Sequence, residues 1–282
     1  MNEKLKNLNI TIQTVYKTES KEAKDPLEGV LYDITPVSGT AVNIATTTSV
    51  PGMREFKTER THGVAVDAVQ TIAPRKHEAT LDVKREDIED DNLGRIPAQV
   101  KMMVRNAARY YGGLAATALN LGFTAKLSDS KTVFHADRGN LVTGALSETT
   151  FTKAYDALLG MKDDNGDPVG AVPKTLIVGV ENRAVAEQIL KAQNKANGES
   201  NTNYKAVELV VDARISGKTW ALVGDSILPI TIAERVKIGA PVAKNDLNSD
   251  AAFEKDVFSW GLRGRFDAAF ADIKQIVAGQ GK

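Results

Sequence analysis

The chain has 282 residues, and 36 lysine and arginine side chains balance 36 aspartates and glutamates, so no global field attracts nucleic acid or an anionic membrane. Cysteine is absent, which excludes disulfides, thiolate metal sites and cysteine nucleophiles. The length allows a sizeable core in one or two lobes. No apolar run approaches the roughly 18 residues of a membrane span. The first twelve residues lack the apolar core of a secretory signal.

Residues 1–28 are charged and end in Glu22-Ala23-Lys24-Asp25-Pro26, a composition typical of a mobile terminal arm. Such an arm is either functional or a frayed end without a role, and the sequence leaves both open. Residues 29–53 are rich in Val, Ile and Thr, with Pro36 and Gly39 as breaks. This pattern predicts short strands.

Residues 54–85 alternate weakly between apolar and polar side chains, break at Ala73-Pro74-Arg75-Lys76, and then alternate again. The pattern predicts a long β-hairpin. Because so polar a ribbon has little to bury by itself, we expect it to lie on another surface, for which a neighbouring copy of the chain is one candidate. The alternative is two strands of a larger internal sheet with one face in water.

An acidic run, residues 86–94, precedes the clearest helix, which is expected over residues 95–121. Asp91 or Asn92 is predicted to cap its first turn, and Gly122 is predicted to end it in the left-handed conformation. The double glycine Gly112-Gly113 predicts a bend or a close backbone approach. The expected buried stripe consists of Val100, Val104, Ala107, Tyr111, Leu114 and Ala118.

A second lobe is predicted over residues 135–245, where helical patterns at 149–161 and 183–192 alternate with apolar strands. This alternation indicates an α/β or α+β lobe. Residues 246–282 form a tail whose alternating segment, 257–277, predicts a long strand or strand pair that runs back to the first lobe.

No group of residues has the spacing of a catalytic, cofactor or metal site. His62, His77 and His135 lack a second ligand at metal-type spacing. The Asp163-Asp164-Asn165-Gly166-Asp167 segment fails as a calcium loop because Pro168 stands at the required glycine position. Neither a phosphate-binding glycine motif nor a nucleophile elbow occurs, so we expect no enzyme, no cofactor and no metal.

Several short segments in a fixed order carry a resemblance to a known family. They are Arg85-Glu86-Asp87-Ile88-Glu89-Asp90-Asp91-Asn92-Leu93-Gly94, Asn120-Leu121-Gly122-Phe123-Thr124, Phe134-His135-Ala136-Asp137, Met161-Lys162-Asp163-Asp164-Asn165-Gly166-Asp167-Pro168, Pro173-Lys174-Thr175-Leu176-Ile177-Val178, Leu209-Val210-Val211-Asp212-Ala213-Arg214-Ile215 and Trp220-Ala221-Leu222-Val223. In this order they resemble the Mu-like bacteriophage major head subunit (major capsid protein) family, over residues 46–265. Residues 1–45 and the tail match less well.

The resemblance implies an α+β chain with the Hong Kong 97-type phage capsid fold. Its parts would be an N-terminal arm (1–28), peripheral-domain strands (29–53), an extended loop (54–85), a peripheral domain with a spine helix (86–134, helix 95–121), an axial domain (135–245) and a returning tail in the peripheral domain (246–282). The extended loop is expected to contact a neighbouring subunit through Arg54, Lys57, Glu59, Arg60, Arg75 and Lys76.

The resemblance also implies the function of a major capsid protein that self-assembles, in hexamers and pentamers, into the icosahedral head of a tailed bacteriophage or prophage. The implied partners are a scaffold protein, a portal, decoration proteins and packaged double-stranded DNA without sequence recognition. The implied location is the virion, assembled in the bacterial host cytoplasm. An encapsulin-like or gene-transfer-particle shell, and a cytoplasmic nucleotide- or sugar-binding α/β enzyme, stay as alternatives.

Overall fold

The computed structural model describes residues 1–45, 69–90, 92–163, 166–194 and 198–281. Its helices are α1 (Asn2–Glu22), α2 (Arg85–Glu89), α3 (Ile96–Leu121), α4 (Glu148–Leu159), α5 (Arg183–Lys191) and α6 (Asp250–Lys255), with short 3₁₀ turns η1 (Ala136–Arg138), η2 (Val180–Asn182) and η3 (Ile273–Gln275). Its strands are β1 (Tyr32–Pro36), β2 (Val42–Ala45), β3 (Val69–Ile72), β4 (Arg75–Lys84), β5 (Leu141–Thr143), β6 (Pro173–Val178), β7 (Glu208–Val211), β8 (Thr219–Gly224), β9 (Ile230–Val236), β10 (Val242–Lys244), β11 (Val257–Phe270) and β12 (Ile276–Gln280). No helix within the described ranges is both long and apolar enough to cross a membrane.

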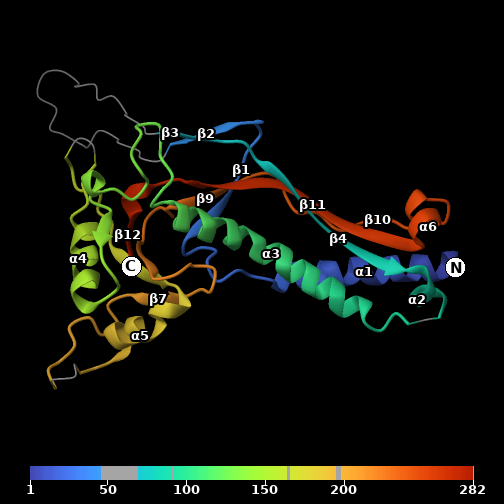
Figure 1. The fold of residues 1–282 in the computed structure, drawn as a ribbon, viewed down its shortest axis with the longest axis horizontal. Helices are drawn as coiled ribbons and strands as arrows, with labels where there is room; N and C mark the ends of the chain where they lie inside the picture. Colours follow the sequence, from blue (N-terminus) through green and yellow to red (C-terminus); the bar gives the residue numbers. More distant parts are fainter. Residues whose placement is uncertain (46–68, 91, 164–165, 195–197, 282) are drawn as a thin grey trace, which may run out of the picture.

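An elongated first lobe is built on β11, a strand of 14 residues. On this strand β4 pairs antiparallel along one edge, and β9 and β10 pair antiparallel with other parts of it. The parallel pairing of β1 with β9 completes the five-stranded sheet. Alternate residues of β11 are buried, as expected for a strand with one face on a core. The sheet therefore forms a long platform on which helices pack (Figure 1).

Helices α1 and α3 cover one face of this platform, and α1 packs along α3. Leu5, Leu8 and Ile12 recur at helical spacing and are buried in one cluster with Val100 of α3 and Trp260 of β11. The prediction that residues 1–28 form a mobile arm is wrong for residues 2–22. The buried residues, together with the half-buried Val15 and Tyr16, anchor this helix in the core.

Within the described residues, the two strands of the predicted hairpin range, β3 and β4, do not pair with each other. β3 pairs antiparallel with β2, which lies before the predicted range, and β4 pairs with β11 of the same chain. The break at Ala73-Pro74 is therefore a step between two different sheets and not a hairpin tip. Residues 54–68 lie outside the described residues. For β4 the structure agrees with the alternative reading, a strand of a larger internal sheet.

The second lobe holds a mixed five-stranded sheet in the order β5-β12-β8-β6-β7, with α4 and α5 beside it (Figure 1). Two strands depart from the predicted partition of the chain. β9 lies in the range assigned to the axial domain but joins the long sheet of the first lobe, and β12 lies in the returning tail but joins the sheet of the second lobe. One hydrophobic cluster spans both lobes, since Ile177 and Val223 pack in the same group as Leu119 and Phe266.

An ion cluster fixes the junction between the lobes. Arg214, after β7, donates to both carboxylate oxygens of Asp25 at 2.6 and 3.0 Å, and to both oxygens of Asp212 at 2.6 and 2.9 Å. It also donates to the carbonyl oxygen of Arg109 in α3 at 2.7 Å. The Asp25 carboxylate is fully buried and lies against Gly112, where an added Cβ would come within 2.3 Å of it. At Gly112 the close neighbour is therefore the side chain of Asp25 and not the backbone that was predicted.

The ends of α3 differ from the predictions. Arg95 stands at the N-cap without a side-chain cap, and the acidic run begins a separate short helix, α2. Pro97 lies in the first turn, where its missing N–H costs no hydrogen bond. Gly122 is right-handed with φ −58°, and the need for glycine comes from Phe134, whose ring would lie 2.5 Å from an added Cβ.

Candidate assembly surface

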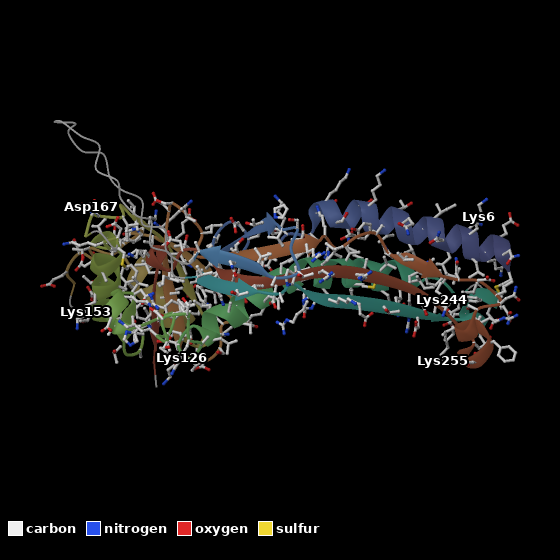
Figure 2. The ribbon with its side chains drawn as sticks, turned by 90° about the horizontal axis from the view of Figure 1, so that it is seen from above. Lys6, Lys126, Lys153, Asp167, Lys244 and Lys255 are labelled. Carbon is white, nitrogen blue, oxygen red and sulfur yellow. The ribbon has the colours of Figure 1, made fainter. Side chains whose placement is uncertain are left out.

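Among the described strands, β4 has a partner on one edge only, β11. Six of its ten residues, from Lys76 to Leu81, line a groove beside α3. An unpaired edge of this length is a template for another extended chain. Figure 2 shows β4 running along the margin of the sheet in the elongated lobe.

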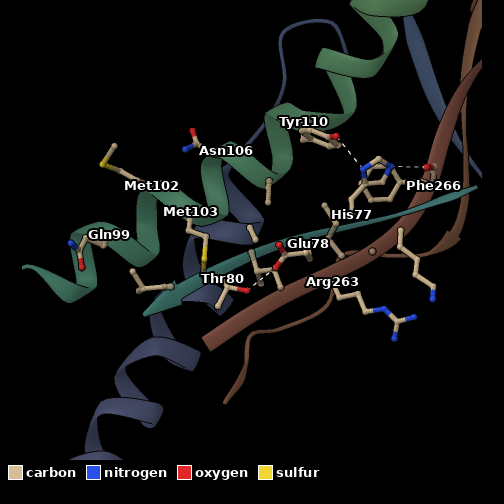
Figure 3. A pocket seen from close by; sticks show the side chains of 17 residues that line it. His77, Glu78, Thr80, Gln99, Met102, Met103, Asn106, Tyr110, Arg263 and Phe266 are labelled. Carbon is tan, nitrogen blue, oxygen red and sulfur yellow. Dashed lines mark hydrogen bonds between the residues drawn. The ribbon is translucent and has the colours of Figure 1, made fainter. Parts of the chain in front are cut away.

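The groove between α3 and β4 has a volume of about 620 Å³. From α3 it receives Gln99, Met102, Met103, Asn106 and Tyr110, and from β4 and β11 it receives His77, Glu78, Thr80, Leu262 and Phe266, among others (Figure 3). The residue Met102 is 64% exposed and Tyr110 is 45% exposed. Exposed methionine beside an exposed aromatic ring is typical of a contact surface, because the flexible thioether adapts to its partner.

An aromatic cluster closes one end of the groove. The His77 ring stacks on Phe266 at 4.6 Å between centroids and lies 5.0 Å from the ring of Tyr110. His77 Nε2 lies 3.0 Å from the carbonyl oxygen of Phe266, which can only accept, so Nε2 carries the proton. In the neutral ring Nδ1 then accepts from the Tyr110 hydroxyl at 3.1 Å. Both ring nitrogens are engaged, which leaves His77 no lone pair for a metal.

Two further polar side chains of the groove pair with each other. Glu78 accepts from the Thr80 hydroxyl at 2.7 Å, and neither residue lies in a Ser-His-Asp type arrangement. In the described part of the chain, no three His, Asp or Glu side chains gather as metal ligands. The geometry can hold an extended peptide by backbone pairing and apolar contact.

The predicted contact residues lie in different places. Arg75 forms an ion pair with Asp267 of its own chain at 2.7 Å, and this hydrogen bond raises the pKa of the Arg75 guanidinium. Its side chain is still 68% exposed. Lys76 lines the groove. The other predicted contact residues, Arg54, Lys57, Glu59 and Arg60, lie outside the described residues.

The predicted stripe of α3 divides into two groups. Val100, Val104 and Tyr111 are buried, while Ala107, Leu114 and Ala118 are half-buried. Burial is the largest cause that raises the pKa of the Tyr111 hydroxyl, which donates to Glu234 at 2.6 Å. Ala107 lines the groove, and Leu114 and Ala118 line a second pocket of about 310 Å³ beside β3.

Sequence reasoning missed the groove residues Met102 and Tyr110. The sequence did contain an indication of them, because both are large apolar or aromatic residues that lie outside the buried face of the helix. It also missed the Arg214 cluster, whose members are separated by up to 189 positions in the chain.

Comparison with known proteins gives the context for this surface. A family model described as "Phage capsid protein" matches residues 67–278. The "Mu-like prophage FluMu major head subunit" of Haemophilus influenzae is 24% identical over 238 residues, which cover 83% of this chain and 59% of that protein. The chain thus spans about three fifths of the length of this curated relative.

Solved capsid structures share the fold. The procapsid of bacteriophage JBD30 matches with a TM-score of 0.57 at 19% identity, covering 95% of this chain and 73% of that one. The capsid of Ralstonia phage GP4 matches with 0.59 at 10% identity and 92% of both chains. A virus-like particle from Pyrococcus furiosus matches with 0.60 at 9% identity, over 95% of this chain and 97% of that one.

These findings confirm the predicted α+β, Hong Kong 97-type fold and the resemblance to Mu-like head subunits. The family model covers well over half of the chain, from β3 to β12. On this evidence the chain belongs to the phage capsid protein family.

Proposed function

We propose that this protein is the major capsid subunit of a tailed bacteriophage or prophage, and that its copies assemble into an icosahedral head that encloses the genome. The observation that carries the proposal is the family match over residues 67–278. In this role the subunit is structural and not catalytic, and its location is the virion.

The groove supports the proposal by offering a surface that suits a second copy. The open edge of β4 supplies backbone groups, and Met102 and Tyr110 supply exposed apolar area beside it. A strand from a neighbour would pair with the edge and bury these side chains. In a closed shell the contact repeats in every subunit, so modest individual contacts add up to a stable lattice.

The predicted contact residues remain in the proposal, except that Arg75 also pairs with Asp267 of its own chain. Lys76 borders the groove and is proposed to meet the neighbouring copy. Arg75 is proposed to contact the neighbour through its exposed portion while Asp267 holds its guanidinium. Arg54, Lys57, Glu59 and Arg60 stay proposed contacts on the basis of their charge alone.

Hexamers and pentamers are the proposed capsomers, formed in the host cytoplasm with a scaffold protein and a portal, and with decoration proteins added to the shell. Double-stranded DNA is the proposed content, enclosed without sequence recognition. A scaffold or portal is proposed because it accompanies this kind of shell.

A shell that holds a protein cargo is the second candidate. The chain shares its fold with the Pyrococcus furiosus virus-like particle over 97% of that chain, so the fold is compatible with either kind of shell.

Electron microscopy of the expressed protein, alone and with a co-expressed scaffold, tests the proposal. Closed particles of uniform size are expected. Particles that contain nuclease-protected DNA favour the phage head, whereas particles that enclose a protein other than the added scaffold favour the cargo shell. A chain that stays monomeric at high concentration under both conditions would contradict both candidates.

A further inference from the structure

The helical layer of the first lobe is basic although the whole chain is neutral. Helices α1 and α3 together contain seven basic and three acidic side chains, a net charge of +4, against +0 for the chain. All three acidic residues, Glu3, Glu19 and Glu22, lie in α1. The 26 residues of α3 include Lys101, Arg105 and Arg109 and no acidic residue.

The basic residues of α3 form a line along one flank. Lys101, Arg105 and Arg109 follow one another at four-residue spacing, so they stack on the same side of the helix. Glu19 of α1 pairs with Lys101 at 2.6 Å and with Arg105 at 3.0 Å. One carboxylate therefore faces two cations, and both cations keep about half of their side-chain surface in water, at 43% and 52%.

The solvent side of α1 extends this charge. Lys6, Lys17 and Lys21 are exposed and lie on the helix face opposite the buried Leu8 and Ile12. Figure 2 shows α1 along one margin of the molecule, with Lys6 near its N-terminal end. We call the six residues Lys6, Lys17, Lys21, Lys101, Arg105 and Arg109 the basic stripe.

We propose that the basic stripe binds the phosphate backbone of duplex DNA and so makes the helical layer the genome-facing side of the shell. This inference rests on the proposed function, which it extends by assigning a surface to the enclosed nucleic acid. The 26 residues of α3 span about 39 Å, slightly more than one turn of B-DNA, about 34 Å. Exposed lysine and arginine along such a length neutralise phosphates without reading bases.

The composition of the stripe favours DNA over a protein partner. A docked protein helix needs apolar anchors at helical spacing, and on the solvent face of α1 the large apolar side chain that is exposed is Ile10. Phosphate contacts need only charge and access. Many copies in a shell repeat the stripe, so weak binding by each copy becomes strong in sum.

The other face of the long sheet also carries basic side chains. There Arg263 lies directly opposite Glu78, so their charges partly cancel, but Lys76 lies opposite Arg265. The experiment therefore needs a variant of this face beside the variant of the stripe.

Fluorescence anisotropy with the full-length protein and a short labelled DNA duplex tests the inference, with salt varied between about 50 and 200 mM. The test variant is Lys6→Gln/Lys17→Gln/Lys21→Gln, which leaves the Glu19 ion pairs intact. The matched control is Lys126→Gln/Lys153→Gln/Lys174→Gln, which removes the same charge from exposed positions near or within the second lobe. A second variant, Lys76→Gln/Lys84→Gln, probes the sheet face.

The wild-type protein is expected to bind the duplex, and the test variant to lower the slope of log affinity against log salt by about 2.7, at about 0.9 for each lost phosphate contact. The control should keep the wild-type slope. The inference is overturned if the wild type does not bind DNA at low salt, if test and control variants weaken binding equally, or if the sheet variant alone weakens it. Shell formation by the same preparations is scored separately by electron microscopy, so closed shells without DNA affinity reject the stripe and leave the proposed function standing.

Discussion

Arg214 holds Asp25 through two hydrogen bonds, at 2.6 and 3.0 Å, although 189 positions separate them in the sequence. Asp25 lies in the connection between α1 and β1, and Arg214 lies between β7 and β8 of the second lobe. Asp212 shares the guanidinium, and its hydrogen bonds with Arg214 hold the pKa of the Asp212 carboxyl below its usual range in spite of burial. The contact ties both lobes to the middle of α3 through the carbonyl of Arg109.

Replacing Asp25 by alanine should strongly lower the free energy of unfolding of the subunit. The substitution removes a fully buried carboxylate and leaves Arg214 with one of its two carboxylate partners, and breaking a buried pair typically costs about 3 kcal/mol or more. Urea unfolding of the unassembled subunit measures the change. Asp137→Ala is the control, because its ion pair with Lys131 is exposed and should contribute little to stability. Equal losses for the two variants would show that the junction does not depend on Asp25.

The adjacent glycines of α3 should respond with opposite signs to alanine. Gly112→Ala places a methyl group within 2.3 Å of the Asp25 carboxylate, so it should cost about 1 to 3 kcal/mol of unfolding free energy. Gly113 has nothing within 4 Å of the added Cβ, and Gly113→Ala should gain up to about 1 kcal/mol from helix propensity. Urea midpoints of the two variants test this. A gain at Gly112 would contradict the close approach.

Substitutions at the buried positions of helix α1 should destabilise the subunit as substitutions in its core do. Ile12 is fully buried among residues of α3 and β11, so Ile12→Ala should cost about 2 to 5 kcal/mol. Ile10, two positions away, is 55% exposed, and Ile10→Ala should change the stability by less than about 0.5 kcal/mol. Thermal unfolding of both variants distinguishes an anchored helix from a mobile arm, for which the two would behave alike.

The Glu19 ion pairs predict a dependence on pH. The hydrogen bond from Lys101, together with that from Arg105, lowers the pKa of Glu19 below its ordinary value of 4.5. A carboxyl whose folded pKa is depressed stabilises the fold above its unfolded pKa, and this contribution disappears as the pH falls through the folded pKa. At neutral pH the wild-type protein should therefore have a higher melting temperature than Glu19→Gln. The difference between the two melting temperatures should disappear below about pH 4.5. A difference in melting temperature that does not change with pH would show that Glu19 stabilises the fold by packing and not by its charge.

Periodic elements were predictable from the sequence because their signal is local. Helices α4 and α5 lie within two residues of the predicted ranges 149–161 and 183–192, since their apolar residues repeat at helical spacing. Helix α1 was missed because lysines and glutamates surround its three buried residues. The pairing of β4 with β11 was missed because the strands lie about 180 positions apart, and alternation within a strand does not identify its partner.

The candidate surface was partly predictable. The charge of residues 54–85 pointed to contact between copies, and Lys76 does border the groove. The groove itself depends on how α3 crosses β4, which no local pattern encodes. Asp267 is 192 positions from Arg75, so the sequence alone could not predict the ion pair between them.

The most direct test of assembly through the groove compares Met102→Glu with Met102→Leu. Both variants alter a side chain that is 64% exposed, so both subunits should fold, as circular dichroism would verify. Sedimentation velocity and electron microscopy should find closed particles for wild type and Met102→Leu, and free subunits for Met102→Glu, because a buried unpaired charge opposes the contact. A normal yield of particles from Met102→Glu would contradict the account.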